Sequence, residues 1–176
     1  MGEVDAMLNK APYAIVILRF LLAPVFVYAF MLDITTLAII LYIVVFVSDI
    51  ADGKISKKLE TTSSSTLEAY LDPVADFVFV LMSFYAFSLR GFYPTWILVA
   101  IVFIFLLFVT SSKGKKPLYD PVGKYYGTFL VAMIGITLLL PIELILEYTM
   151  LLIVAYTFVL AIYRLAFVWK IRVMEQ

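Results

Sequence analysis

Four aspartates lie in two pairs at the ends of neighbouring apolar runs, where carboxylates are uncommon. Asp49 and Asp52 are three residues apart and close one run, whereas Asp72 and Asp76 are four apart and open the next. Apolar runs of this length belong in lipid, where an ionised carboxylate costs several kcal/mol. Four carboxylates close together also repel one another unless a cation neutralises them. Because divalent cations bind carboxylate oxygens readily, the pattern indicates a metal site.

Helical spacing places the members of each pair on one face of their own helix. The first face holds the side chains at i, i+3, i+4 and i+7, namely Asp49, Asp52, Gly53 and Ser56. The second face holds those at i, i+4 and i+8, namely Glu68, Asp72 and Asp76. Two antiparallel helices would turn these faces toward each other across a narrow gap. Gly53 leaves a smooth backbone patch beside Asp52, which a flat ligand can approach closely.

These residues resemble the signature of the CDP-alcohol phosphotransferase family. That signature reads D-x-x-D-G-x-x-A-R, then a short loop, then G-x-x-x-D-x-x-x-D, and this chain matches it at all four aspartates and at Gly53. The run 71–76, L-D-P-V-A-D, is also similar to a run of the phosphatidylglycerophosphate synthase branch. Three positions depart from the signature: Ser56 for Ala, Lys57 for Arg and Glu68 for Gly. In the family, these positions serve the nucleotide more than the metals.

The resemblance implies an enzyme of phospholipid biosynthesis. It would transfer a phosphatidyl-type group from a CDP-linked lipid alcohol to a hydroxyl acceptor and release CMP. Two ions of Mg²⁺ or Mn²⁺ are implied as cofactors, and a homodimer as the assembly. By resemblance, the metal ligands are Asp49, Asp52, Asp72 and Asp76, and Asp76 is also the general base. The residues implied to bind the donor nucleotide are Asp52, Gly53, Ser56 and Lys57.

A second resemblance concerns the acceptor. The stretch 123–128 is similar to the G-K-x-K-T of glycerol-phosphate-using members, with Tyr126 in place of the second lysine. We expect Lys124 and Arg164 to bind an acceptor phosphate, which makes glycerol 3-phosphate a candidate acceptor. The alternative is a helix start with an interfacial belt of Lys and Tyr. We favour the belt for Tyr125 and Tyr126.

Composition limits the chemistry and the fold. The chain has 176 residues, of which 65% are hydrophobic and 15% charged, with no net charge. It has no cysteine and no histidine, so disulfides, thiolate or imidazole metal sites and histidine catalysis are excluded. Acid–base chemistry therefore falls to carboxylates, lysine or tyrosine. No nucleic-acid partner is expected.

Six apolar runs predict an all-α integral membrane protein with one polytopic domain over residues 1–176. A short interfacial arm, residues 1–11, precedes the first span. The expected spans are residues 12–32, 34–55, 66–89, 92–112, 125–146 and 147–169. Lysines and arginines gather in the connections on one side, whereas Arg90 lies on the other. The positive-inside rule then places both termini and the aspartates toward the cytoplasm.

Two residues near the motif have alternative interpretations. Arg19, inside the first run, either snorkels to the membrane surface or pairs with a carboxylate or phosphate. Glu68 either forms a capping box with Ser65 at the start of a helix or ligates metal, and we favour the cap.

Two other functions compete with the enzyme. The departures from the signature suit a non-catalytic relative, although carboxylates in lipid are costly to keep without a use. An intramembrane cation-binding or transport protein would also place Asp on its helices. Such a protein would more often show unwound Gly/Pro breaks mid-membrane and pseudo-symmetric halves, and we see neither in this sequence.

Overall fold

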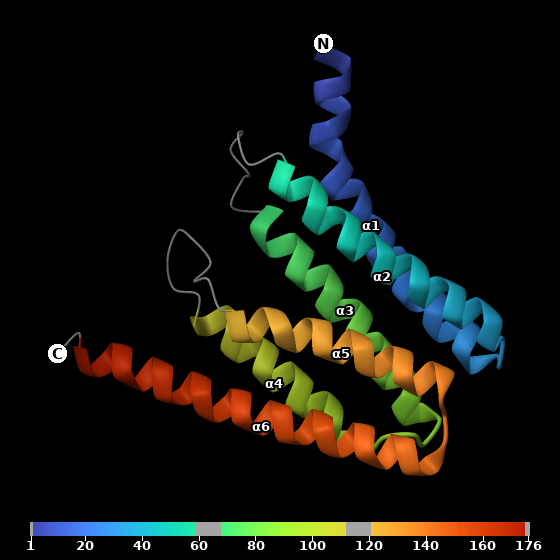
Figure 1. The fold of residues 1–176 in the computed structure, drawn as a ribbon, viewed down its shortest axis with the longest axis vertical. Helices are drawn as coiled ribbons and strands as arrows, with labels where there is room; N and C mark the ends of the chain where they lie inside the picture. The colour runs from blue at the N-terminus through green and yellow to red at the C-terminus, as the bar shows by residue number, and fades with distance from the viewer. Residues whose placement is uncertain (1, 59–67, 112–120, 175–176) are drawn as a thin grey trace. The chain divides into compact units, whose positions relative to one another are not determined.

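The computed structural model describes residues 2–58, 68–111 and 121–174, which form six α-helices and no strand (Figure 1). Side chains are described for residues 16–49, 73–109 and 125–166. The helices are α1 (Gly2–Met31), α2 (Thr35–Lys58), α3 (Glu68–Leu89), α4 (Trp96–Ser111), α5 (Pro121–Leu139) and α6 (Glu143–Met174). The described residues therefore confirm the all-α class.

The first helix extends beyond the first expected span. α1 is continuous from Gly2 to Met31, so the expected arm is not a separate segment but the beginning of this helix. Its place at a membrane interface stays a prediction.

The boundary between the last two expected spans was wrong. We expected the fifth span to pass through Pro141 and end at residue 146, but α5 ends at Leu139 and α6 begins at Glu143. Proline has no backbone N–H, and its ring disfavours helical geometry at the preceding residue, Leu140. The chain therefore turns at this proline, and the residues after it start a new helix.

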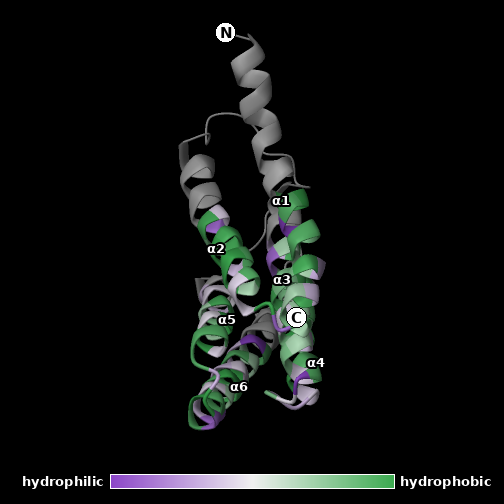
Figure 2. Cartoon of the chain, turned by 90° about the vertical axis from the view of Figure 1, so that its right-hand side faces the viewer, coloured by the Kyte–Doolittle hydropathy of each residue, from purple (hydrophilic) through white to green (hydrophobic). Residues whose placement is uncertain are grey.

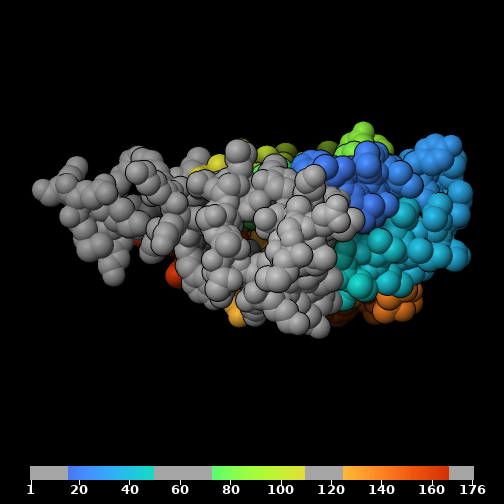
Figure 3. All heavy atoms as spheres, turned by 90° about the horizontal axis from the view of Figure 1, so that it is seen from above, coloured from blue at the N-terminus to red at the C-terminus, as the bar shows by residue number. Residues whose placement is uncertain are grey.

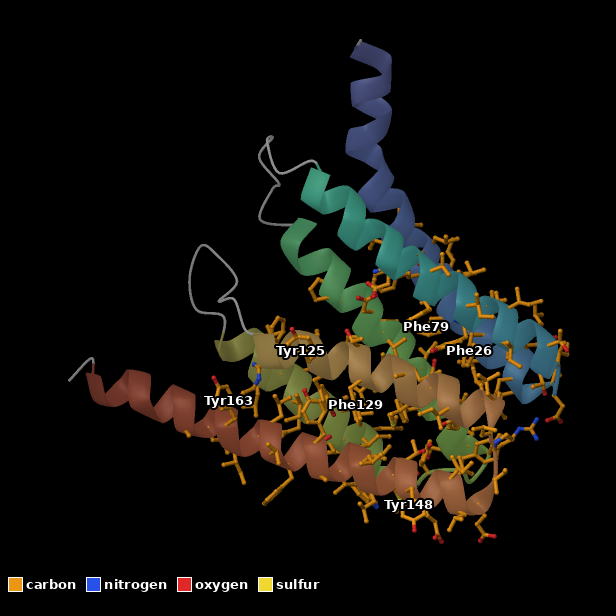
Figure 4. All side chains as sticks on the ribbon, viewed as in Figure 1. Phe26, Phe79, Tyr125, Phe129, Tyr148 and Tyr163 are labelled. Carbon is orange, nitrogen blue, oxygen red and sulfur yellow. The ribbon has the colours of Figure 1, made fainter. Side chains whose placement is uncertain are left out.

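The chain divides into two compact units, Met1–Ala86 and Phe87–Gln176, with the boundary inside α3. In the first unit, α1 and α2 pack along each other, and their atoms are in direct contact in the space-filling view (Figure 3). Phe26 of α1 meets Phe79 of α3 edge to face, with ring centroids 5.4 Å apart (Figure 4). This aromatic contact joins α3 to the helix pair. The single membrane domain expected over residues 1–176 remains a prediction.

The turns after α1 and α3 have the same helix-ending geometry. After α1, the N–H of Ile34 donates to the carbonyl of Ala29 and that of Asp33 to Phe30. After α3, Phe92 and Gly91 repeat this pattern of hydrogen bonds. The residue at the left-handed position is Asp33 in the first turn, with φ 60°, and Gly91 in the second, with φ 76°. Both turns are Schellman motifs, which satisfy the last carbonyls of a helix.

In the second unit, α6 packs against both α4 and α5. Two buried hydroxyl pairs support this packing. The Tyr93 and Thr137 hydroxyls are 2.6 Å apart, and the Tyr126 and Thr157 hydroxyls are 2.7 Å apart. Such hydroxyl contacts between helices are typical where the surroundings are apolar.

Many large hydrophobic side chains of the described residues are exposed. Figure 2 shows hydrophobic residues along all six helices. Within the described residues, one helical segment, Glu143–Ala166, is long and apolar enough to cross a membrane, with a mean hydropathy of 2.1. The other apolar segments are shorter: 16–31, 35–49, 73–89, 96–109 and 125–139. The number of spans and their orientation therefore remain predictions.

Candidate functional site

Arg19 of α1 is the centre of a polar cluster in the first unit. Its side chain is 0% exposed, and all three guanidinium nitrogens face polar atoms of other helices. Nη1 donates to Oδ1 of Asp76 on α3 at 2.7 Å, and Nη2 lies 3.6 Å from Oδ1 of Asp49 on α2. Nε donates to the Ser48 hydroxyl at 3.4 Å. One guanidinium therefore joins a residue from each half of the aspartate motif.

Ser48 is held in the orientation that this cluster needs. Its hydroxyl donates to the carbonyl of Val45, one turn earlier on α2, at 2.7 Å. Because the hydroxyl hydrogen is used in that bond, the oxygen presents lone pairs to Arg19 Nε. We did not predict a role for Ser48, since a serine in an apolar run usually bonds to its own helix, as this one also does.

The structure decides between the two interpretations of Arg19. A snorkelling arginine would carry its guanidinium to the surface, but this one is buried and bonded to a carboxylate. The interpretation as a partner for a carboxylate is confirmed. The short contact with Asp76 is a charge-assisted hydrogen bond, whereas the 3.6 Å separation from Asp49 is an ion pair without that bond.

The two aspartates of the motif whose side chains are described remain partly accessible. The Asp49 side chain is 47% exposed and that of Asp76 is 36% exposed, although Arg19 between them is buried. Both contacts with Arg19 involve Oδ1 atoms. The guanidinium thus approaches the two carboxylates from the protein interior, and the exposed part of each faces outward.

The remaining motif residues lie on the expected helices, but their side chains are outside the described residues. α2 continues to Lys58 and α3 begins at Glu68. The residues concerned are Asp52, Gly53, Ser56 and Lys57 on α2, with Glu68 and Asp72 on α3. Ser65 lies outside the described residues altogether, so the capping box of Glu68 stays a prediction. Pro73 is accommodated inside α3, between the two aspartates of that helix.

The donor set of the described pair suits a hard divalent cation. Asp49 and Asp76 offer carboxylate oxygens from two different helices, which Mg²⁺ and Mn²⁺ prefer over soft ligands. Within the side chains that are described, no group of three or more potential ligands comes together. A complete site would need the other two aspartates of the motif, whose side chains are not among those described.

The second unit contains another buried arginine. Arg164 of α6 is 4% exposed, and its guanidinium carbon lies 5.1 Å from the centre of the Phe108 ring on α4. A guanidinium over an aromatic face is a cation–π contact. This contact orients the charged group within the packing of α4 against α6.

The expected tyrosine belt was wrong for one of its two residues. Tyr125 is 66% exposed, but Tyr126 is 6% exposed, and its hydroxyl meets that of Thr157 on α6. Since the Thr157 hydroxyl donates to the carbonyl of Ile153, Tyr126 is the donor of the pair. Tyr126 therefore bonds α5 to α6 inside the protein, which a belt residue would not do.

Comparison with known families agrees with the motif and the helical fold. A model of the CDP-alcohol phosphatidyltransferase family matches residues 9–169, which is most of the chain. The protein therefore belongs to the CDP-alcohol phosphatidyltransferase family. This is a membrane-associated family whose activity is the transfer of a phosphatidyl group from a CDP-alcohol. A sequence search among curated proteins gives no match.

Proposed function

We propose that this protein is a metal-dependent transferase that moves a substituted phosphate group from a CDP-linked lipid to a hydroxyl acceptor, with CMP as the leaving group. The observation that carries the proposal is the convergence of Asp49 and Asp76 on Arg19. The two carboxylates come from opposite ends of the aspartate motif, on different helices. Their joint contact with one guanidinium supports a shared site rather than two separate ones.

The four aspartates have two tasks in this proposal. Asp49, Asp52 and Asp72 hold one or two ions of Mg²⁺ or Mn²⁺ with their oxygens, and Asp76 helps to hold them. Bound divalent cations would neutralise the donor pyrophosphate and stabilise the leaving group. Asp76 also accepts the proton of the attacking hydroxyl.

The donor nucleotide would lie along the end of α2. Asp52, Gly53, Ser56 and Lys57 follow Asp49 on the same helix, at spacings that return to one face. Gly53 leaves room for the nucleotide, and Lys57 contacts a donor phosphate as a point charge where the family has a bidentate arginine.

The acceptor would be a phosphorylated alcohol, with glycerol 3-phosphate as the first candidate. The bond between Tyr126 and Thr157 fixes the register of α5 against α6. Lys124 precedes Tyr126 on α5, and Arg164 follows Thr157 by about two turns on the antiparallel α6. Both residues therefore stand on their helices beyond the hydroxyl pair in the same direction, which supports a shared role in binding phosphate.

Three broader features belong to the same proposal. The L-D-P-V-A-D run at 71–76 is similar to a run of the phosphatidylglycerophosphate synthase branch and supports membership of that branch. The protein would be a multi-pass membrane homodimer. Its active site and both termini would face the cytoplasm, as the distribution of Lys and Arg indicates.

The deciding experiment is a CMP-release assay with purified protein in detergent. CDP-diacylglycerol is supplied with Mg²⁺ or Mn²⁺ and, in separate reactions, glycerol 3-phosphate, glycerol or no acceptor. We expect CMP only when both metal and acceptor are present, with glycerol 3-phosphate preferred over glycerol. Absence of CMP with every acceptor, in protein that binds Mn²⁺, would favour a cation-binding protein without transferase activity.

Two variants separate the tasks of the aspartates. Asp76→Asn keeps an oxygen ligand but loses the base, so turnover should fall by about 10²–10⁴-fold while Mn²⁺ and donor still bind. Asp49→Asn should weaken the binding of Mn²⁺ and donor together. Calorimetry of both ligands beside the CMP assay measures the difference. Turnover near the wild-type rate in Asp76→Asn would remove Asp76 as the base.

A further inference from the structure

Arg19 has a geometry that charge neutralisation alone does not require. Three different nitrogens of its guanidinium face three side chains: Nη1 faces Asp76, Nη2 faces Asp49 and Nε faces Ser48. Asp49 and Ser48 are neighbours on α2, whereas Asp76 is on α3. The planar, rigid guanidinium therefore fixes the positions of groups on two helices relative to a third.

We propose that Arg19 is the positioning residue that sets the Asp49 and Asp76 carboxylates at the spacing at which they bind a divalent cation together. The inference deepens the proposed function and rests on its assignment of these aspartates as ligands. Arg19 would not contact the substrate or the cation. It acts by holding one oxygen of each carboxylate from the buried side, while both side chains stay partly exposed.

The physical basis is that ligands must be held in position before a metal arrives. A carboxylate that is free to choose among rotamers loses that freedom on binding a metal, and this loss weakens affinity. Hydrogen bonds from neighbouring groups restrict the ligand in advance, and their removal typically costs about 10–100-fold in metal affinity or activity. Arg19 is fully buried and bonded to Asp76 at 2.7 Å, so it is well placed to restrict that ligand.

Arg19→Lys is the informative variant because it separates charge from geometry. Lysine keeps the positive charge that balances the two carboxylates, but its three N–H donors radiate from one nitrogen and cannot match contacts made by three separated nitrogens of a planar group. We expect the variant to keep its helicity but to unfold at a lower temperature than the wild type, because the directed bond to Asp76 is weakened, so Mn²⁺ binding is measured well below its unfolding midpoint. Its Mn²⁺ dissociation constant, measured by calorimetry without substrate, should rise by about 10–100-fold.

Two further variants complete the experiment. Arg90→Lys, at the turn between α3 and α4, makes the same chemical change in the other compact unit and should leave Mn²⁺ affinity unchanged. Ser48→Ala removes only the partner of Arg19 Nε and should weaken Mn²⁺ binding by a smaller factor. If Arg19→Lys does not fold, Ser48→Ala decides the question, and unchanged Mn²⁺ affinity in that variant would overturn the proposal.

The results also separate this proposal from the proposed function. An active wild type, with an Arg19→Lys variant that binds Mn²⁺ equally well, would overturn the positioning role and leave the enzyme intact. A wild type that binds Mn²⁺ but releases no CMP would overturn the enzyme, and the positioning role would still be decided by the Mn²⁺ affinities. A wild type that binds no Mn²⁺ would overturn both.

Discussion

The two contacts of Arg19 with carboxylates should differ in strength, and a double-mutant cycle can measure both. The perturbations are Arg19→Gln, Asp76→Asn and Asp49→Asn, singly and in the two pairs that include Arg19. Asp→Asn removes a charge with little change of volume, whereas Arg19→Gln also shortens a buried side chain, a cost that cancels in the coupling energy. The coupling energy from each cycle reports the interaction between Arg19 and one aspartate.

The structure sets the expected magnitudes. Arg19 and Asp76 form a direct hydrogen bond at 2.7 Å with one partner fully buried, and bonds to charged groups contribute about 1.5–3 kcal/mol. Asp49 lies at 3.6 Å and is 47% exposed, so solvent screens its interaction to about 0–1 kcal/mol. We therefore expect a coupling energy for Asp76 that exceeds that for Asp49 by about 1–2 kcal/mol.

The assay is reversible unfolding in mixed detergent micelles, followed by circular dichroism, without divalent metal. The absence of metal matters because bound Mn²⁺ would stabilise the folded state through the same carboxylates. An Asp49 coupling equal to or larger than that of Asp76 would refute the reasoning. That result would mean that the contact distance and the burial do not determine which of the two interactions is stronger.

The same unfolding assay tests two other features. Tyr126→Phe should destabilise the protein by about 1 kcal/mol, because the buried Thr157 hydroxyl loses its donor, whereas Tyr125→Phe at an exposed position should change nothing. Equal effects of the two changes would contradict the role of Tyr126. Gly91→Ala should destabilise by about 1 kcal/mol through its positive φ alone, since an added Cβ meets no atom within 4 Å. Asp33→Gly should instead stabilise slightly, by up to about 1 kcal/mol, because it relieves the same left-handed conformation. If both variants changed the free energy of unfolding in the same direction, the backbone φ angle would not be what controls the stability of these turns.

The aspartate motif could be read from the sequence because its information is local. The intervals between Asp49 and Asp52, and between Asp72 and Asp76, are helical spacings, and helices α2 and α3 carry these residues as expected. The partner of Asp76 could not be identified in the same way. Arg19 is 57 residues away in the chain, and an arginine in an apolar run has the same local pattern whether it snorkels or pairs.

Helix boundaries show a similar limit. Hydropathy alone does not distinguish a helix from two helices joined by a short apolar turn, so the residues after Pro141 were assigned to the wrong helix. The proline carried the necessary signal, because it disfavours helical geometry at the residue before it. No comparable signal distinguishes Tyr126 in the sequence, since its neighbour Tyr125 has the same side chain and the opposite exposure.

The burial of Arg19 connects the stability of the first unit to its proposed chemistry. A guanidinium in an apolar interior pays a desolvation cost of several kcal/mol, which is offset only when a well-placed anion accompanies it. Asp76 is that anion, so the packing of α1 against α3 depends on the residue to which we assign proton transfer. Substitution of Asp76 is therefore expected to lower stability as well as the turnover that we propose. For this reason, the loss of activity in Asp76→Asn must be measured on folded protein, with Mn²⁺ binding as the evidence that the site is still assembled.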